Sequence, residues 1–125
     1  MIVHTPVSVG ELVDKITILE IKKELFTDEN KIQNVTSELS FLRNALPETD
    51  DIFNEFYALY NINKTLWKIE DDIRKKEKNK EFDEEFIKLA RLVYYTNDVR
   101  AKLKKDINTK VGSTLIEEKQ YDDYK

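Results

Sequence analysis

Seven polar residues interrupt the apolar faces of segments that otherwise have the hydrophobic period of an α-helix. They are two arginines, three carboxylates and two amides, namely Asp14, Glu20, Asn63, Glu70, Arg74, Asn97 and Arg100. Two guanidinium groups in one pocket would hold an anionic group through paired N–H donors, and neighbouring carboxylates would orient it. The chemistry that these residue types offer is therefore the binding of an anion, provided that the fold brings them together.

The segment 9–26 has two apolar faces. The first contains Val9, Leu12, Val13, Ile16 and Leu19, and the second contains Ile18, Ile21 and Leu25. At 100° per residue, Glu20 falls on the first face and Asp14 lies at the edge of the second. A helix that is apolar on two sides either lies at the centre of its bundle or contacts another protein.

The other interruptions lie on two later segments, at Asn63, Glu70 and Arg74 in 51–78 and at Asn97 and Arg100 in 83–110. Burying an unpaired ion costs several kcal/mol, so buried groups of this kind must meet one another, water or a ligand. We expect Glu20, Glu70, Arg74 and Arg100 to be mostly buried in one connected cluster. In it, Glu70 would pair with Arg74 along one helix, and Glu20 would meet Arg100 across helices.

Two interpretations of this cluster are open. In the first, it is a satisfied structural network that fixes the register of the helices. In the second, it is a pocket whose arginines hold an anionic group. A solvent-reachable cavity beside the two arginines would favour the pocket, whereas a dry and fully paired network would favour the structural role.

Four helices must position these residues, and we expect them over 9–26, 28–45, 51–78 and 83–110. Ser8 and Glu11 form a capping box before the first, Pro47 ends the second, and Gly112 suits a left-handed cap after the last. Short connections make successive helices antiparallel. The predicted fold class is all-α: one domain over 1–125, an elongated antiparallel bundle of about four helices with short extended termini.

The tail after Gly112 has no helical period. Its apolar residues 114–116 either pair with Ile2 and Val3 as a short strand or dock on the bundle. A further alternative is that the tail, through Leu115, Ile116 and Tyr121, covers the second apolar face of 9–26.

Composition excludes several classes of protein. The 125 residues contain no cysteine, which rules out disulfides and thiolate metal sites. Charged residues make up 37%, against about 25% in globular proteins, and the basic run at 75–80 is interleaved with acidic residues, so no nucleic-acid patch is expected. Without an apolar run near 18 residues or a signal peptide, we expect no membrane span and a cytoplasmic location.

Familiar catalytic and metal sites are also absent from the pattern. The single histidine, His4, lies in the extended lead-in, so neither a Ser-His-Asp triad nor a Glu-x-x-His di-iron site can form. Two glycines cannot build a phosphate-binding loop. Glu81 and Glu84 resemble half of the acidic set of metal-dependent nucleotide hydrolases, but the second pair is missing, and acidic residues are common at helix starts. We therefore predict no metal and no cofactor.

Four blocks of the sequence are distinctive and together cover nearly the whole chain. They are GELVDKITILEIK at 10–22, LWKIEDDIR at 66–74, TNDVR at 96–100 and LIEEKQY at 115–121. Together they resemble a bacterial family of domains of unknown function, and the matched positions include six of the seven interruptions, all but Asn63. The resemblance implies no activity. It implies, through gene neighbourhoods with glycosyltransferases and tetratricopeptide proteins, a link to surface-polysaccharide metabolism.

Two functions remain open from the sequence. The first is a non-catalytic binding or accessory domain, a homodimer that works beside sugar-transfer enzymes and contacts a protein partner or a small anionic ligand. The second is a small helical enzyme that acts on an anionic metabolite, with Arg74 and Arg100 for charge and Glu20 or Glu70 for proton transfer. The homodimer is expected because the second apolar face of 9–26 must be covered by something.

Overall fold

The computed structural model describes residues 1–49 and 51–125. Its four helices are α1 (Val9–Leu25), α2 (Glu29–Ala45), α3 (Phe53–Lys78) and α4 (Glu84–Val111). The described residues form no strand, so the predicted all-α fold is confirmed, and each helix begins and ends within two residues of its predicted position.

Capping side chains explain where most of these helices begin and end. The hydroxyl of Ser8 accepts a hydrogen bond from the Glu11 N–H, and the carboxylates of Asp28 and Asp83 do the same for α2 and α4. Gly112 ends α4 with a φ of 67°, as the left-handed cap requires. The carboxylate of Glu11 does not complete the predicted capping box by returning to Ser8, because it accepts a hydrogen bond from Lys104 instead.

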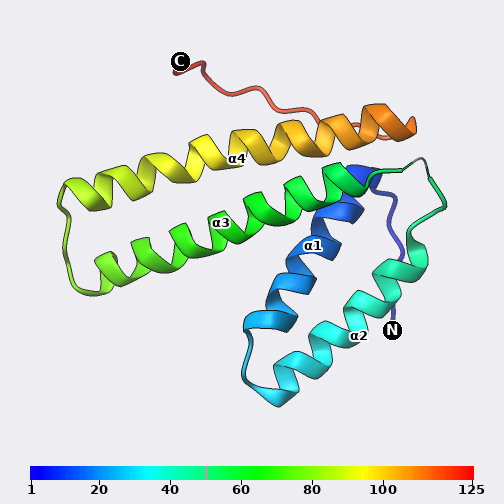
Figure 1. Cartoon of the computed structure of the whole chain (residues 1–125), viewed down its shortest axis with the longest axis horizontal. Coiled ribbons are helices and arrows are strands. Elements are labelled where there is room, and N and C mark those ends of the chain that lie inside the picture. The colour runs from blue at the N-terminus through cyan, green and yellow to red at the C-terminus, as the bar shows by residue number, and fades with distance from the viewer. Residues whose placement is uncertain (50) are drawn as a thin grey trace.

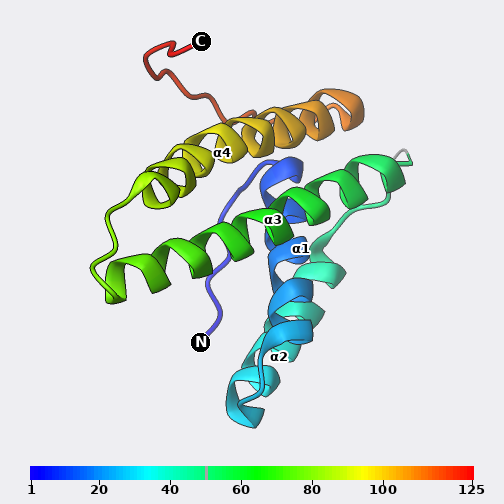
Figure 2. The ribbon, with the colours of Figure 1, turned by 60° about the vertical axis from the view of Figure 1, so that its left-hand side comes forward.

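The helices are arranged as two antiparallel hairpins that cross each other. Helices α3 and α4 lie side by side along the length of the molecule, and the α1–α2 hairpin crosses them at a steep angle near one end (Figures 1 and 2). Helix α1 is central, because it contacts α2, α3 and α4. The interpretation of its two apolar faces as the mark of a central helix is therefore confirmed.

The core is divided between the two sides of α1. Leu12, Ile16 and Leu19 pack against Val35 and Leu39 of α2. On the other side, the fully buried Val13 packs against Leu59 of α3 and Ile107 of α4. Of the second predicted face, Ile21 is fully buried and Leu25 is exposed.

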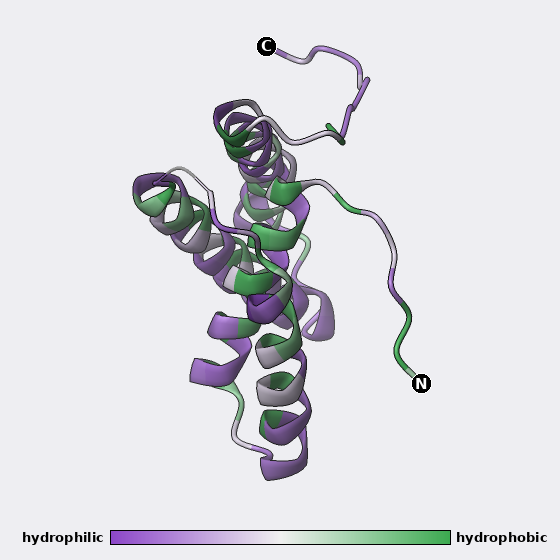
Figure 3. Ribbon diagram, turned by 90° about the vertical axis from the view of Figure 1, so that its right-hand side faces the viewer, coloured by the Kyte–Doolittle hydropathy of each residue, from purple (hydrophilic) through white to green (hydrophobic). Residues whose placement is uncertain are grey.

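The two chain ends lie on different sides of the molecule (Figures 1 and 2). The lead-in is hydrophobic at its very start, whereas the tail is mostly hydrophilic (Figure 3). The predicted strand pairing between residues 2–3 and 114–116 is absent from the described chain. The tail docks instead on α4, through ion pairs of Glu117 with Lys104 and of Glu118 with Lys105. The alternative in which the tail covers α1 is therefore wrong.

Candidate functional site

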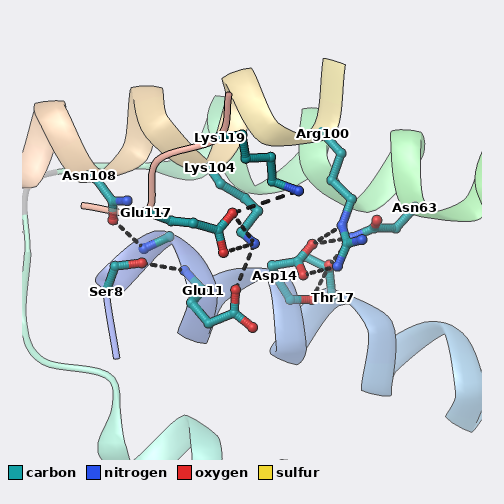
Figure 4. A network of polar contacts seen from close by, with 11 residues as sticks. Ser8, Glu11, Asp14, Thr17, Asn63, Arg100, Lys104, Asn108, Glu117 and Lys119 are labelled. Atoms are coloured by element: carbon teal, nitrogen blue, oxygen red, sulfur yellow. Dashed lines mark hydrogen bonds and ion pairs between the residues drawn. The ribbon is translucent and has the colours of Figure 1, made fainter. Parts of the chain in front are cut away.

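A buried carboxylate anchors the site. Asp14 of α1 is 1% exposed, and Arg100 of α4 binds both of its oxygens, with Nε donating to Oδ1 at 2.9 Å and Nη2 donating to Oδ2. Asn63 of α3 donates its amide N–H groups to Oδ1 of Asp14 at 2.8 Å and to the hydroxyl of Thr17 at 2.9 Å. Figure 4 shows that these side chains converge from three helices. The network therefore fixes α1, α3 and α4 at one point.

The electrostatics of this network keep the guanidinium charged. The pKa of Arg100 is raised above its ordinary value, chiefly by the hydrogen bond to Asp14. Burial opposes this effect, and the negative charges of Asp14, Glu11 and Glu117 add to it. Arg100 is thus a permanent cation held in one orientation by a carboxylate that water hardly reaches.

A cleft of about 500 Å³ opens beside this anchor. Its polar lining comes from α3 and α4 and consists of Asn63, Glu70, Asp71, Arg74, Asn97 and Arg100. Its apolar lining consists of Ile18, Ile21, Leu66 and Trp67. Five of the seven residues predicted from the sequence therefore line one cleft, and Asp14 lies behind it as the partner of Arg100.

The model of a family of unknown function, DUF6165, matches residues 3–124. The chain belongs to this family. The matched range contains all four of the sequence blocks described above. No curated protein and no solved structure matches the chain. The family model covers nearly the whole chain, but the function of the family is unknown. The chemistry of the cleft must therefore be argued from the residues that line it.

The predicted burial of Glu70 and Arg74 is wrong. The side chain of Arg74 is 78% exposed and that of Glu70 is 45% exposed. Their predicted ion pair is confirmed, with Nε of Arg74 at 3.2 Å from Oε2 of Glu70. The reason is that α3 is longer than the part of it that α1 crosses, so its later turns line an open cleft and not a closed core.

Glu20 does not join the other residues, and the predicted contact between Glu20 and Arg100 is wrong. Glu20 pairs with Arg43 of α2, whose Nη2 lies 2.6 Å from Oε1. Six residues along a helix correspond to 600°, so Glu20 points to a different side of α1 from Asp14. The single connected cluster expected from the sequence is thus three separate groups: the Asp14 anchor, the Glu70–Arg74 pair and the Glu20–Arg43 pair.

A second buried network joins the start of α1 to α4 and the tail, and sequence reasoning missed it. Lys104 is almost fully buried, and its Nζ lies 2.6 Å from Glu11 and 3.3 Å from Glu117 (Figure 4). Burial alone would lower the pKa of Lys104, but the hydrogen bond to Glu11 and the surrounding carboxylates outweigh it, so the pKa is raised. Close by, Asn108 accepts a hydrogen bond from the Gly10 N–H at 2.6 Å.

Gly10 was the one signal in the sequence for this close contact. A Cβ at this position would lie 2.4 Å from the carbonyl oxygen of Lys104, so only glycine lets α1 approach α4 this closely.

Among the described residues, no three metal-ligating side chains come together. None of the described helices combines the length and the apolar character that crossing a bilayer requires.

Proposed function

We propose that the chain is a non-catalytic binding domain whose ligand is a small anion that carries hydroxyl groups. The observation that carries this proposal is the open cleft beside both arginines. A cavity of this kind was the feature that separates a ligand pocket from a purely structural network. Its volume of about 500 Å³ falls within the range of about 300–1,000 Å³ typical of small-molecule sites.

The two arginines differ in how they would act. Arg100 uses two of its five N–H donors on Asp14, which fixes the guanidinium and leaves its other edge for the cleft. Because the side chain is already held, binding loses little of its conformational freedom. Arg74 is less tightly held, since its side chain is 78% exposed and donates one hydrogen bond, to Glu70. It would close over an anion that Arg100 has positioned.

The carboxylates define the rest of the ligand. Glu70 and Asp71 only accept hydrogen bonds, whereas the arginines only donate them. A ligand that satisfies both must carry acceptors and donors, as an anion with hydroxyl groups does. Trp67 adds a flat apolar wall against which the C–H face of a sugar ring can pack. A sugar phosphate meets all of these requirements, and it agrees with the link to sugar-transfer enzymes that the sequence resemblance implies.

A titration with glucose 1-phosphate tests the proposal. Trp67 is the single tryptophan of the chain and lines the cleft, so its fluorescence reports occupancy directly. We expect Arg74→Ala to weaken binding about tenfold, the lower end for hydrogen bonds to charged groups. Arg43→Ala is the matched control, because it removes an exposed arginine paired with a glutamate outside the cleft. Equal affinity in the wild type and both variants would contradict the proposal, as would the absence of binding.

If the chain is instead a small enzyme, only one of the two candidate proton-transfer residues lies in the cleft. Glu70 lines the cleft beside Arg74, whereas Glu20, the other candidate, is paired with Arg43 at the α1–α2 contact. The enzyme would be favoured over the binding domain by two results together. The wild type would convert the bound ligand, and Glu70→Gln would bind the ligand with the same affinity without converting it.

The homodimer stays a prediction. Most of the apolar surface of α1 is covered by the other three helices of the same chain, so α1 no longer requires a partner subunit. The argument for a homodimer now rests on apolar side chains that are exposed on other helices. Phe41 of α2 and Phe53 of α3 are each more than half exposed. A surface of this kind is what a self-complementary interface would cover.

A further inference from the structure

A second pocket lies between α4 and the tail. Its volume is about 620 Å³, and its aromatic walls are Tyr94 of α4 with Tyr121 and Tyr124 of the tail. Asn97 lines both this tyrosine pocket and the arginine cleft, so the two hollows adjoin along α4. Nothing in the function proposed above uses this second pocket.

The tyrosine pocket has one fixed wall and one exposed wall. The ring of Tyr124 packs edge-on against those of Tyr94 and Tyr95, with centroids 5.0 Å apart in both cases. Its phenol donates a hydrogen bond to Asp98, which fixes it on α4. Tyr121, in contrast, is 77% exposed although it lines the pocket. A planar ring inserted here would gain aromatic contact with Tyr121 without displacing another ring.

The polar groups of the pocket suit a heteroaromatic ring better than a plain hydrocarbon. The amide of Asn97 offers a donor and an acceptor, and the carboxylate of Asp122 accepts hydrogen bonds. Amide and carboxylate side chains are among those that read the edges of nucleobases. Stacking on aromatic side chains supplies the remaining affinity for an unpaired base.

The spacing along α4 links the two pockets into one site. Tyr94, Asn97 and Arg100 are three residues apart, so each turns about 60° from the one before it. Asn97 therefore lies between the direction of Tyr94 and that of Arg100, in agreement with its place in the lining of both pockets. At 1.5 Å per residue, Tyr94 and Arg100 are separated by about 9 Å along the helix axis, so a ligand that contacts both must follow the turn of α4 past Asn97. A molecule with a ring at one end and a phosphate at the other would reach both pockets past Asn97, which lines each of them.

We propose that the ligand is a nucleotide, with its phosphate at Arg100 and its base among the tyrosines of the second pocket. This inference rests on the proposed function for the phosphate and adds the tyrosine pocket as the site of the base. Where the phosphate carries a further sugar, as in a nucleotide sugar, that sugar would lie against Trp67. Asn97, at the junction, is placed to contact the ribose or the base.

Calorimetric titration of the full chain with AMP, UMP and ribose 5-phosphate tests this inference. We expect at least one nucleotide to bind more tightly than ribose 5-phosphate. Tyr121→Ala should weaken nucleotide binding by about 5- to 150-fold, the usual effect of removing one stacking partner, and leave ribose 5-phosphate unchanged. Tyr57→Ala is the matched control, because Tyr57 is an exposed tyrosine of α3 that lines neither pocket.

The possible results separate the two proposals. If ribose 5-phosphate binds but neither nucleotide binds more tightly, or if Tyr121→Ala has no effect, the nucleotide is ruled out and the hydroxyl-bearing anion stands. If none of the three probes binds, the nucleotide is ruled out, and the titration with glucose 1-phosphate decides the proposed function separately. A nucleotide whose affinity falls in Tyr121→Ala and in Arg74→Ala, but not in Tyr57→Ala, supports both pockets as parts of one site.

Discussion

Replacing Arg100 by alanine is the sharpest test of how the site is built. The substitution removes both hydrogen bonds that Arg100 donates to Asp14, and it leaves that carboxylate with the amide of Asn63 as its side-chain partner. Asp14 is 1% exposed, so water cannot replace the lost guanidinium without opening the contact between α1 and α4. The variant therefore leaves a buried charge without a counter-ion.

The magnitude follows from burial on the two sides of the pair. Removing one partner of a buried ion pair costs about 3–5 kcal/mol, because the remaining charge loses its compensation. The Arg100 side chain is 29% exposed, so the pair reaches solvent at one edge and the lower end of that range applies. We expect Arg100→Ala to lower the free energy of unfolding by about 3 kcal/mol. Arg74→Ala, whose side chain is 78% exposed in an i,i+4 pair, should cost less than about 0.5 kcal/mol.

Urea unfolding followed by circular dichroism measures both values on the same chain. The denaturant slope should stay constant across the variants, since the surface exposed on unfolding hardly changes. The double variant Asp14→Ala/Arg100→Ala should recover part of the loss, because it leaves no unpaired charge in the core. Equal free energies of unfolding for Arg100→Ala and Arg74→Ala would refute the role of the Asp14–Arg100 pair as an anchor. So would a double variant that loses more free energy of unfolding than Asp14→Ala and Arg100→Ala lose when added together.

Three further predictions concern other parts of the molecule. Gly10→Ala should destabilise the fold by about 1–3 kcal/mol in thermal melts, because its Cβ would meet the Lys104 carbonyl at 2.4 Å and push α1 away from α4. The hydrogen bond to Asp98 raises the pKa of Tyr124 to about 12. An alkaline absorbance titration of Tyr124→Phe should therefore lack the last tyrosine ionisation that the wild type shows. The stabilisation by this hydrogen bond is present below pH 10.0 and is lost as the pH rises through about 12. Sedimentation at micromolar concentration should show a species of twice the 14.9 kDa chain mass, and a single species at 14.9 kDa would end the homodimer prediction.

The helices could be predicted from the sequence because their signals are local. The cap residues Ser8, Asp28 and Asp83, together with the hydrophobic period between them, depend on neighbours within a few positions. The same period also identified the sides of α3 and α4 that face the cleft. This is why five of the seven predicted polar residues line one cleft.

The partners of those residues could not be predicted, because they depend on how the two hairpins cross. A period gives the direction of a side chain around its own helix, but not which point of another helix lies opposite. Glu20 and Asp14 were both acceptable partners for Arg100 until the crossing placed Asp14 next to it and Glu20 next to Arg43. The tyrosine pocket was out of reach for a different reason, since the tail that carries Tyr121 and Tyr124 has no periodic pattern.

The hydrogen bond between Gly10 and Asn108 joins positions 98 residues apart, and it has a consequence for synthesis of the protein. Of the four helices, α1 is translated first, and it can pair with α2 once α2 has emerged. Its other face must wait for α4, because Arg100, Lys104 and Ile107 are translated after the other three helices. Until then Asp14 has no cation beside it, and Val13 lacks one of its two neighbouring helices. The arginine cleft therefore comes into existence only after the last helix has left the ribosomal tunnel.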